Sequence, residues 1–384
     1  MKFIKLGEVI YGAKTDRCGD KNFPVLSITK SDGIVLQSEK FKKRIASNDT
    51  QQYKVVKKGQ LVQGIHIDEA NFGIQTIVDA GIVSPAYKIW NVDESKIIPK
   101  YLEIILRSPK SIRYYSSNFN GSVKRRERLS DKDFLAMDIP CPSLLEQQKA
   151  INLIVQLKEI INLREQELQK LDDLVKARFV EMFGDPILNP MGWSKEKTEN
   201  HIDLLSGFPF QSEQYVDSGV NICGGLIIMP QRIQWEECKH WPSVKGFEEY
   251  LLEEGDIVMA LDRPWISEGF KIAQIDIEHL PALLIQRTAR IRGIDIVQEY
   301  LYYCFICGGF DKHSNVTGSL VPHISAKDIR SFEIMLPPID LQNQFAAFVR
   351  QVDKSKSATF LSLLYYYVLH PYIGFTNNFR RKQS

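Results

Sequence analysis

Two clusters of basic residues in the first third of the sequence could bind nucleic acid. The larger cluster follows Gly121-Ser122 and consists of Lys124, Arg125, Arg126 and Arg128. A loop that combines glycine, small polar residues and several guanidinium groups can hold phosphates and form paired hydrogen bonds with guanine edges. The smaller cluster consists of Lys42, Lys43 and Arg44. A solvated charged loop is the alternative interpretation of both clusters.

The second half of the sequence offers a different set of candidates. Arg287, Arg290 and Arg292 lie in a strand-like segment, where alternation puts Arg290 and Arg292 on one face and Arg287 on the other. We predict DNA contacts for Arg287 and Arg290, although a structural ion pair suits each of these arginines equally well. Ser319 and His323 occupy the place where the first half has its larger basic cluster. They are predicted to contact DNA as well, and a core or capping role is the alternative for His323.

The sequence contains none of the common catalytic signatures. It has no phosphate-binding G-x-x-x-x-G-K-[ST] loop, no G-x-G-x-x-G after a strand, no H-E-x-x-H and no G-x-S-x-G. An Asn-Pro-Pro-aromatic tetrapeptide, which would indicate methylation of base amino groups, is also absent. The formal net charge is only +2, from 49 basic and 47 acidic residues, so binding to a polyanion must depend on local clusters. We therefore expect no catalytic residue in this chain.

Four cysteines form the one candidate metal set. Cys304 and Cys307 could bind zinc together with Cys223 and Cys238. The spacing is irregular, however, and Cys304 lies within an apolar, aromatic segment. Buried reduced thiols explain such residues better, and we predict no metal site.

One long helix is expected between Ser143 and Asp185, in the middle of the chain. Apolar residues recur there in alternating steps of three and four, as in a coiled-coil seam. The seam consists of Ile154, Leu157, Ile161, Leu168, Leu171, Val175 and Met182. Leu153, Ile160 and Leu174 widen the apolar stripe, so this helix should have more than one neighbour. Gly184 and Pro186 should end the helix, whose length of about 60 Å suits a spacer.

The residues on either side of this helix form an internal repeat. Gly59-Gln60-Leu61-Val62 returns as Gly255-Asp256-Ile257-Val258, and Ser130-x-Lys132-Asp133 returns as Ser325-x-Lys327-Asp328. Pro142 and Gln147, at the entry to the central helix, return as Pro337 and Gln342 before a second helical segment. The repeat predicts two similar α+β domains with largely β cores, each followed by a helix. The two helices should pair antiparallel and give the chain a pseudo-two-fold axis.

Three segments resemble a known family. They are CPSLLEQQKAI and LREQELQKLDDLVKARFVEMFGDP in the central helix and SLVPHISAKDIRSFEIMLPPIDLQNQFAAFV in the second copy. They look like the DNA-specificity subunit of type I restriction–modification systems, and the similarity runs from about residue 1 to 356. It implies a first target-recognition domain over 1–142, a central conserved helix over 143–185 and a second target-recognition domain over 186–338. The start of a second conserved helix over 339–356 and a divergent tail over 357–384 would follow.

The resemblance also implies partners and a division of labour. Each recognition domain would read one half of a bipartite site in double-stranded DNA, and the helices would dock methyltransferase (modification) subunits. The chain itself would have no activity and no cofactor. S-adenosylmethionine, ATP and Mg would belong to the modification and restriction subunits of a type I restriction endonuclease and adenine-DNA methyltransferase complex. A coiled-coil adaptor joining two protein-binding domains is the alternative function, and a self-contained nuclease or methyltransferase would need a motif that the sequence lacks.

The last part of the chain departs from the family pattern. After Lys356 a charged amphipathic helix would continue, but Phe360 to Leu369 is apolar on all sides and Pro371 follows. Such a tail, as if frame-shifted, should shorten the coiled coil and weaken one modification-subunit site. The sequence shows neither a membrane-length apolar run nor a signal peptide. With six cysteines expected to be reduced, we predict a cytoplasmic protein.

Overall fold

The computed structural model describes residues 2–30, 32–40, 49–118, 129–314 and 323–369 of the chain. By its contacts, the chain divides into two compact units. The first unit comprises residues 1–165 and 361–384, and the second comprises residues 166–360. Each unit mixes helices with small, mostly antiparallel sheets, as the predicted α+β class requires. In the described residues, no helix is both long and apolar enough to cross a membrane.

The first unit is built on a four-stranded antiparallel sheet in the order β2-β9-β6-β7. These strands are Ile10–Gly12, Lys88–Val92, Leu61–Gln63 and Phe72–Ile74. The smaller strand pairs are β1 (Phe3–Lys5) with β10 (Asp138–Pro140), β3 (Leu26–Thr29) with β4 (Gly33–Leu36), and β5 (Lys54–Lys57) with β8 (Ala80–Val83). The helices are α1 (Gln37–Lys40), α2 (Pro99–Leu106), α3 (Pro109–Ser117) and α4 (Asp131–Leu135). Fully buried Phe72, Tyr115 and Phe134 stack against one another and join the sheet to α3 and α4.

The second unit repeats this plan with a four-stranded sheet in the order β12-β22-β17-β20. These strands are Ile202–Ser206, Thr288–Gly293, Ile257–Ala260 and Ile272–Gln274. A further sheet contains β16 (Lys239–Trp241), β13 (Val220–Cys223) and β21 (Ala282–Leu284). The strand pairs are β11 (Lys195–Lys197) with β23 (Glu333–Met335), β14 (Ile228–Met229) with β15 (Arg232–Ile233), and β18 (Trp265–Ile266) with β19 (Gly269–Phe270). The helices are α6 (Gln298–Cys307), α7 (Phe310–His313) and α8 (Ala326–Ser331).

The internal repeat predicted from the sequence is confirmed by these two topologies. In the first unit β2 pairs with β9, and β9 pairs with β6, the strand that follows Gly59. In the second unit β12 pairs with β22 in the same way, and β22 pairs with β17, the strand that follows Gly255. Gly59 and Gly255 occupy the same left-handed conformation, with φ of 84° and 83°. A residue with a side chain rarely adopts this conformation, which explains why glycine recurs at the start of β6 and β17.

A buried glutamine performs the same task in each unit. The Gln147 side chain accepts a hydrogen bond from the Ile98 N–H (2.8 Å) and donates one to the Pro142 carbonyl (2.9 Å). The Gln342 side chain accepts one from the Val297 N–H (3.0 Å) and donates one to the Pro337 carbonyl (2.9 Å). Ile98 and Val297 are the residues that precede α2 and α6. Each glutamine therefore fastens the first turn of a long helix to the start of a domain helix.

The two long helices are α5 (Leu144–Phe183) and α9 (Ile339–Leu369). The expected central helix is confirmed, and its ends follow the sequence signals. Ser143 and Glu146 exchange hydrogen bonds at its start, and Gly184 lies directly after its end with φ of 80°. α9 continues past Lys356 without a break as far as Leu369, so the apolar run that departs from the family pattern is helical.

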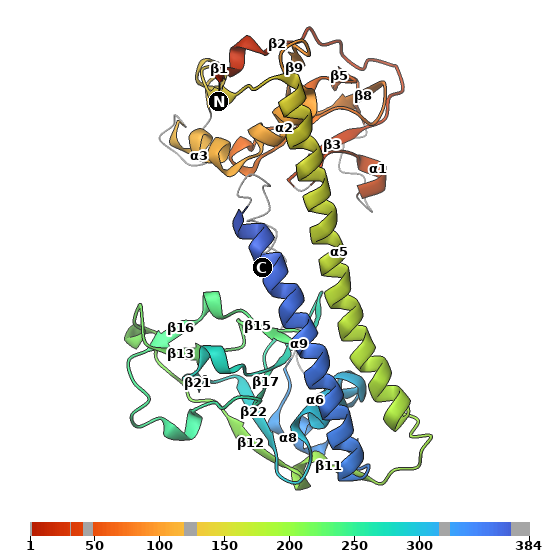
Figure 1. Cartoon of the computed structure of the whole chain (residues 1–384), viewed down its shortest axis with the longest axis vertical. Helices are drawn as coiled ribbons and strands as arrows, with labels where there is room; N and C mark the ends of the chain where they lie inside the picture. The colour runs from red at the N-terminus through yellow and green to blue at the C-terminus, as the bar shows by residue number, and fades with distance from the viewer. Residues whose placement is uncertain (1, 31, 41–48, 119–128, 315–322, 370–384) are drawn as a thin grey trace. The chain divides into compact units, whose positions relative to one another are not determined.

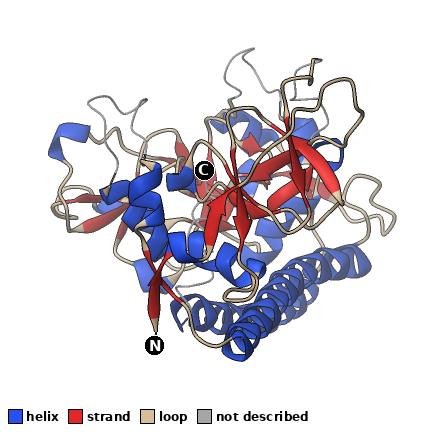
Figure 2. Ribbon diagram, turned by 90° about the horizontal axis from the view of Figure 1, so that it is seen from above, coloured by secondary structure: helices blue, strands red, loops and turns tan. Residues whose placement is uncertain are grey.

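Within the second unit α5 and α9 lie side by side and run antiparallel (Figures 1 and 2). The rings of Phe179 and Phe183 each lie 5.5 Å from the ring of Phe345, near the beginning of α9. Farther from these rings Asp172 forms an ion pair with Lys356 across the helices, at 2.8 Å. Residue numbers thus fall in α5 as they rise in α9, as the predicted antiparallel coiled coil requires.

The predicted seam residues of α5 differ in burial. Leu157, Ile161 and Val175 are buried. The other four, Ile154, Leu168, Leu171 and Met182, are half-buried. Leu171, Val175 and Met182 belong to or pack against the core of the second unit. The predicted set of seam residues did not include Phe179 and Phe183, which are fully buried in that core.

Replacing the buried Gln147 by leucine should destabilise the first unit by about 2 kcal/mol, because the half-buried Ile98 N–H and Pro142 carbonyl lose their partner. Urea unfolding of the full chain measures this change. Gln148→Leu is the matched control, because the Gln148 side chain is exposed and donates a hydrogen bond to Asn152 of its own helix. Its effect should stay within about 0.5 kcal/mol, and equal losses in the two variants would contradict the anchoring role of Gln147.

Candidate nucleic-acid interface

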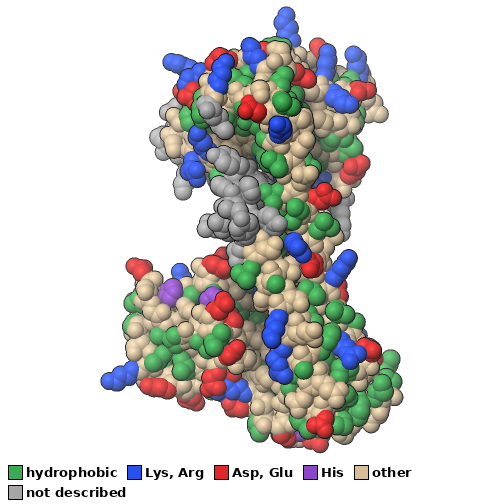
Figure 3. Space-filling model, in the orientation of Figure 1, with side chains coloured by type: hydrophobic (Ala, Val, Ile, Leu, Met, Phe, Trp, Pro, Cys, Tyr) green, Lys and Arg blue, Asp and Glu red, His purple; other side chains and the backbone are tan. Residues whose placement is uncertain are grey.

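Most of the predicted DNA contacts fall outside the described residues. Lys42, Lys43 and Arg44 lie there, as do the larger basic cluster, from Lys124 to Arg128, and Ser319. Arg287, Arg290 and His323 are described, and all three belong to the second unit. On the face shown in Figure 3, basic and acidic side chains are interspersed over each unit. This agrees with the small net charge, so the geometry of individual residues must identify the site.

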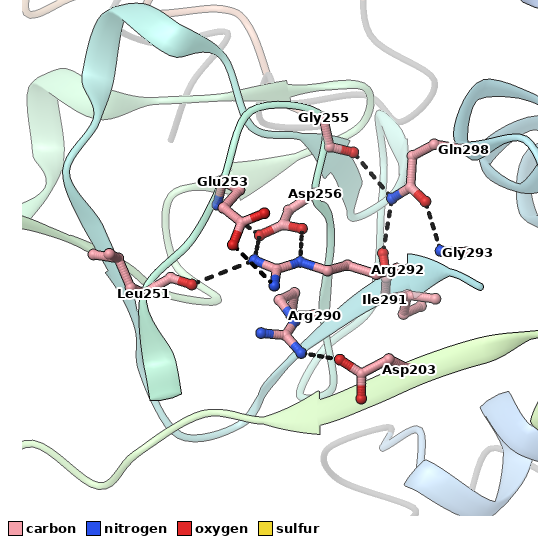
Figure 4. A network of polar contacts seen from close by, with 10 residues as sticks. All are labelled: Asp203, Leu251, Glu253, Gly255, Asp256, Arg290, Ile291, Arg292, Gly293 and Gln298. Atoms are coloured by element: carbon pink, nitrogen blue, oxygen red, sulfur yellow. Dashed lines mark hydrogen bonds and ion pairs between the residues drawn. The ribbon is translucent and has the colours of Figure 1, made fainter. Parts of the chain in front are cut away.

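Arg290 and Arg292 are engaged in ion pairs along β22. The Arg290 guanidinium donates to Asp203 on the neighbouring strand β12, and only 8% of its side chain is exposed. The Arg292 guanidinium bonds both carboxylate oxygens of Asp256, whose side chain is 3% exposed, and pairs with Glu253 at 3.2 Å (Figure 4). The hydrogen bonds to Asp256 raise the pKa of Arg292 above its usual value. Both arginines therefore have structural partners inside the second unit.

Arg287 differs from these two residues in its exposure. It directly precedes β22, and 73% of its side chain is exposed. Its backbone has φ of 62°, and its carbonyl accepts a hydrogen bond from the Leu261 N–H at 2.9 Å. The Arg287 guanidinium donates through Nη1 to Asp262 Oδ2 at 2.8 Å. The side chain is thus held at its end while most of its surface faces solvent.

His323 contacts the same aspartate from another segment. Its Nδ1 lies within hydrogen-bond distance of Asp262 Oδ1, and 48% of its side chain is exposed. The backbones of Asp262 and His323 form an isolated antiparallel bridge, and the next residue, Ile324, donates its N–H to the Leu261 carbonyl at 2.9 Å. Asp262, Arg287 and His323 form the group that we call the Asp262 cluster. From the sequence we predicted Arg287 and His323 as DNA-contacting residues, but we did not predict Asp262, the acidic residue that brings them together.

The corresponding place in the first unit has a different character. Leu61 pairs with Trp90 in the first unit, and the equivalent Ile257 pairs with Ile291 in the second. Ala86 precedes Trp90 by as many residues as Arg287 precedes Ile291, so Ala86 occupies the position of Arg287. A cavity of about 180 Å³ lies there, lined by Gln63, Gly64, Ile65, Ile67, Ala86, Lys88 and Leu129. The two equivalent strand ends thus present a small cavity in one unit and a charged cluster in the other.

The cysteines show no arrangement for a metal ion. In the part of the chain that the structure describes, no group of three or more His, Cys, Asp or Glu side chains could hold one. Cys223 and Cys304 belong to separate hydrophobic cores. Burial raises the pKa of the Cys307 thiol to about 11. These thiols have the apolar surroundings that the sequence predicted for reduced core cysteines.

Comparison with known proteins identifies a family domain in this region. Residues 243–359 match the family described as Type I restriction modification DNA specificity domain. This segment includes the whole Asp262 cluster and the first two thirds of α9. These residues are therefore similar to DNA specificity domains of the type I restriction–modification class.

Two similar proteins are named as specificity subunits of type I restriction enzymes. The type I restriction enzyme EcoAI specificity subunit of Escherichia coli is 29% identical over 177 residues, or 44% of this chain. The type I restriction enzyme MjaVIII specificity subunit of Methanocaldococcus jannaschii is 24% identical over 240 residues, or 58% of this chain. The matches cover 29% and 56% of these relatives, less than two thirds of either. The resemblance drawn from the sequence is confirmed: the chain is related to the DNA-specificity subunits of type I restriction–modification systems.

Solved structures support the fold over almost the whole chain. A chain from a study of complex assembly and conformational transition in a type I system is 17% identical, with a TM-score of 0.57. The match covers 97% of this chain and 96% of that one. The S subunit of a type I system from M. genitalium is 10% identical with a TM-score of 0.53, covering 97% and 94% of the two chains.

Replacing Arg292 by alanine should destabilise the second unit by about 3 kcal/mol, because the buried Asp256 carboxylate loses its guanidinium partner. Arg287→Ala should cost less than about 1 kcal/mol, since its ion pair is exposed. Denaturant unfolding of the two variants beside the unchanged chain tests this difference. A large loss of stability in Arg287→Ala would show that this arginine is a structural residue too.

Proposed function

We propose that this chain is the non-catalytic DNA-recognition subunit of a type I restriction–modification complex. Each unit would read one half of a bipartite duplex site. The observation that carries the proposal is the repeat itself: two units with the same strand order present different side chains at equivalent strand ends. Two unlike half-sites require a common framework with different reading residues. The matching DNA specificity domain favours this function over the coiled-coil adaptor.

The long helices supply the spacing and the docking surface in this proposal. Leu153, Ile160 and Leu174 of α5 are 66%, 36% and 47% exposed. The sequence assigned them to a second neighbour of the helix, and a protein partner is the simplest way to cover a row of exposed apolar residues. We propose that modification subunits cover these residues. The chain would thus connect the DNA half-sites to the enzymes that act on them.

The chemistry would belong to the partners. Methyltransferase (modification) subunits would bind S-adenosylmethionine, and restriction subunits would use ATP and Mg, while this chain contributes no cofactor and no catalytic residue. The complex would act on the cell's own DNA, which places it in the cytoplasm. For the helical segment after Lys356, we retain the hypothesis drawn from the sequence: the site for one modification subunit is weakened.

DNA methylation in cells that carry this chain with a modification subunit should map to a bipartite motif. Replacing residues 1–142 by the corresponding part of a related specificity subunit should change one half of the motif. Replacing residues 186–338 should change only the other half, because each unit reads its own half-site. Single-molecule sequencing of genomic DNA measures both motifs.

The unchanged chain and a double replacement serve as controls for this mapping. A motif that stays the same after either replacement would contradict the division of reading between the units. Methylation that is absent even with the unchanged chain, and also after a full charged helix is restored beyond Lys356, would contradict the specificity role.

Leu153→Glu should weaken binding of a modification subunit by roughly tenfold or more, because the docked helix would bury an unpaired carboxylate. Val155→Glu is the matched control: Val155 is also apolar and 51% exposed, but it lies two positions on and faces away from Leu153. Analytical ultracentrifugation of the mixed subunits gives both affinities. Equal weakening by the two substitutions would exclude a docking face centred on Leu153.

A further inference from the structure

The Asp262 cluster arranges hydrogen-bonding groups in a defined pattern. Asp262 uses one carboxylate oxygen for Arg287 Nη1, at 2.8 Å, and the other for His323 Nδ1. An ionised carboxylate only accepts hydrogen bonds, so in a neutral imidazole the proton is held on Nδ1 and Nε2 is left as an acceptor. Among the described residues, Asp262 is the one partner of both side chains.

The polar atoms of the two side chains that do not bond to Asp262 are donors on Arg287 and an acceptor on His323. Nε and Nη2 of Arg287 are donors that lie in one plane, as a guanidinium requires. In the neutral imidazole, Nε2 of His323 is an acceptor from a different segment of the chain. Because a single carboxylate holds both side chains, the donors and the acceptor are fixed beside each other. Exposed fractions of 73% and 48% leave both side chains accessible.

We propose that the Asp262 cluster reads one G·C base pair through the major groove in the half-site bound by the second unit. The paired donors of Arg287 match O6 and N7 of guanine, and Nε2 of His323 matches the amino group of cytosine. Asp262 is a positioning residue, because it orients both readers without facing a base. The inference rests on the proposed function and specifies the chemistry of one position in the site.

The same pattern disfavours an A·T pair. Adenine presents an amino donor where guanine presents O6, so it would meet a donor of Arg287, and the thymine O4 acceptor would meet the histidine acceptor. Unmatched groups of this kind produce specificity by repulsion as well as attraction. The first unit has Ala86 at the position of Arg287 and a cavity beside it. The preference should therefore appear in one half-site only.

Selection from a random duplex library by the purified full chain provides the test. The unchanged chain should enrich a motif with a G·C pair at one position. The motif enriched by the Arg287→Ala variant should no longer specify G·C at that position. The discrimination against A·T at that position should fall by roughly 5- to 150-fold. Arg287→Lys should lose it as well, because a lysine cannot form the planar pair of donors. Asp262→Asn and His323→Ala should reduce discrimination at the same position and leave the other half-site unchanged.

Arg330→Ala is the matched control, since Arg330 is an exposed arginine on α8 of the same unit and lies outside the cluster. Its motif should be the same as that of the unchanged chain. Arg287→Ala binding that weakens equally on all duplexes, with the motif intact, would show a phosphate contact and overturn the base-reading role. A half-site without any G·C dependence would overturn it too while the proposed function stands. Enrichment of no motif by the unchanged chain would overturn both.

Discussion

The glutamine at the start of each long helix is the interaction on which the construction of both units depends. A helix begins with backbone N–H groups that have no partner in the helix, and the residues before α2 and α6, Ile98 and Val297, are half-buried. Gln147 and Gln342 satisfy one such N–H each and at the same time bind the carbonyl of the proline before their own helix. The amide is suited to this role because it carries an acceptor and a donor on one rigid group.

Aromatic packing then joins the helices in the second unit. Phe345 contacts both Phe179 and Phe183, and Tyr300 of α6 stacks on Phe179 and meets Phe183 edge-on. A core of this kind fixes the direction and the register of α9 on α5. The ion pair from Lys356 to Asp172 keeps the same register farther along. Burial lowers the pKa of Lys356, but the bonds to Asp172 and the nearby Asp353 raise it further, so the ammonium form is favoured.

The sequence was informative where spacing alone determines structure. It predicted the central helix and the repeat, in which the two glutamines recur, because periodic apolar residues and recurrent landmarks need no knowledge of tertiary contacts. The seam omitted Phe179 and Phe183 because these rings belong to a domain core that the heptad pattern does not describe. The partner of Arg290 is separated from it by 87 residues, so no local pattern could identify the ion pair. Asp262 was missed for a related reason: an acidic residue has no place in a search for basic clusters.

Under the proposed function, the separation of the framework from the exposed residues explains how two copies of one fold would differ in recognition. The strand order, the landmark glycines and the buried glutamines hold the ends of β6 and β17 in equivalent places. Arg287 and His323 lie beyond those ends and are exposed, so their replacement costs little folding energy. Arg292 cannot vary in this way, because Asp256 would remain as an unpaired buried charge. Under the proposed function, substitutions at exposed strand ends would change the recognised base pair, while the paired residues beneath them keep the fold.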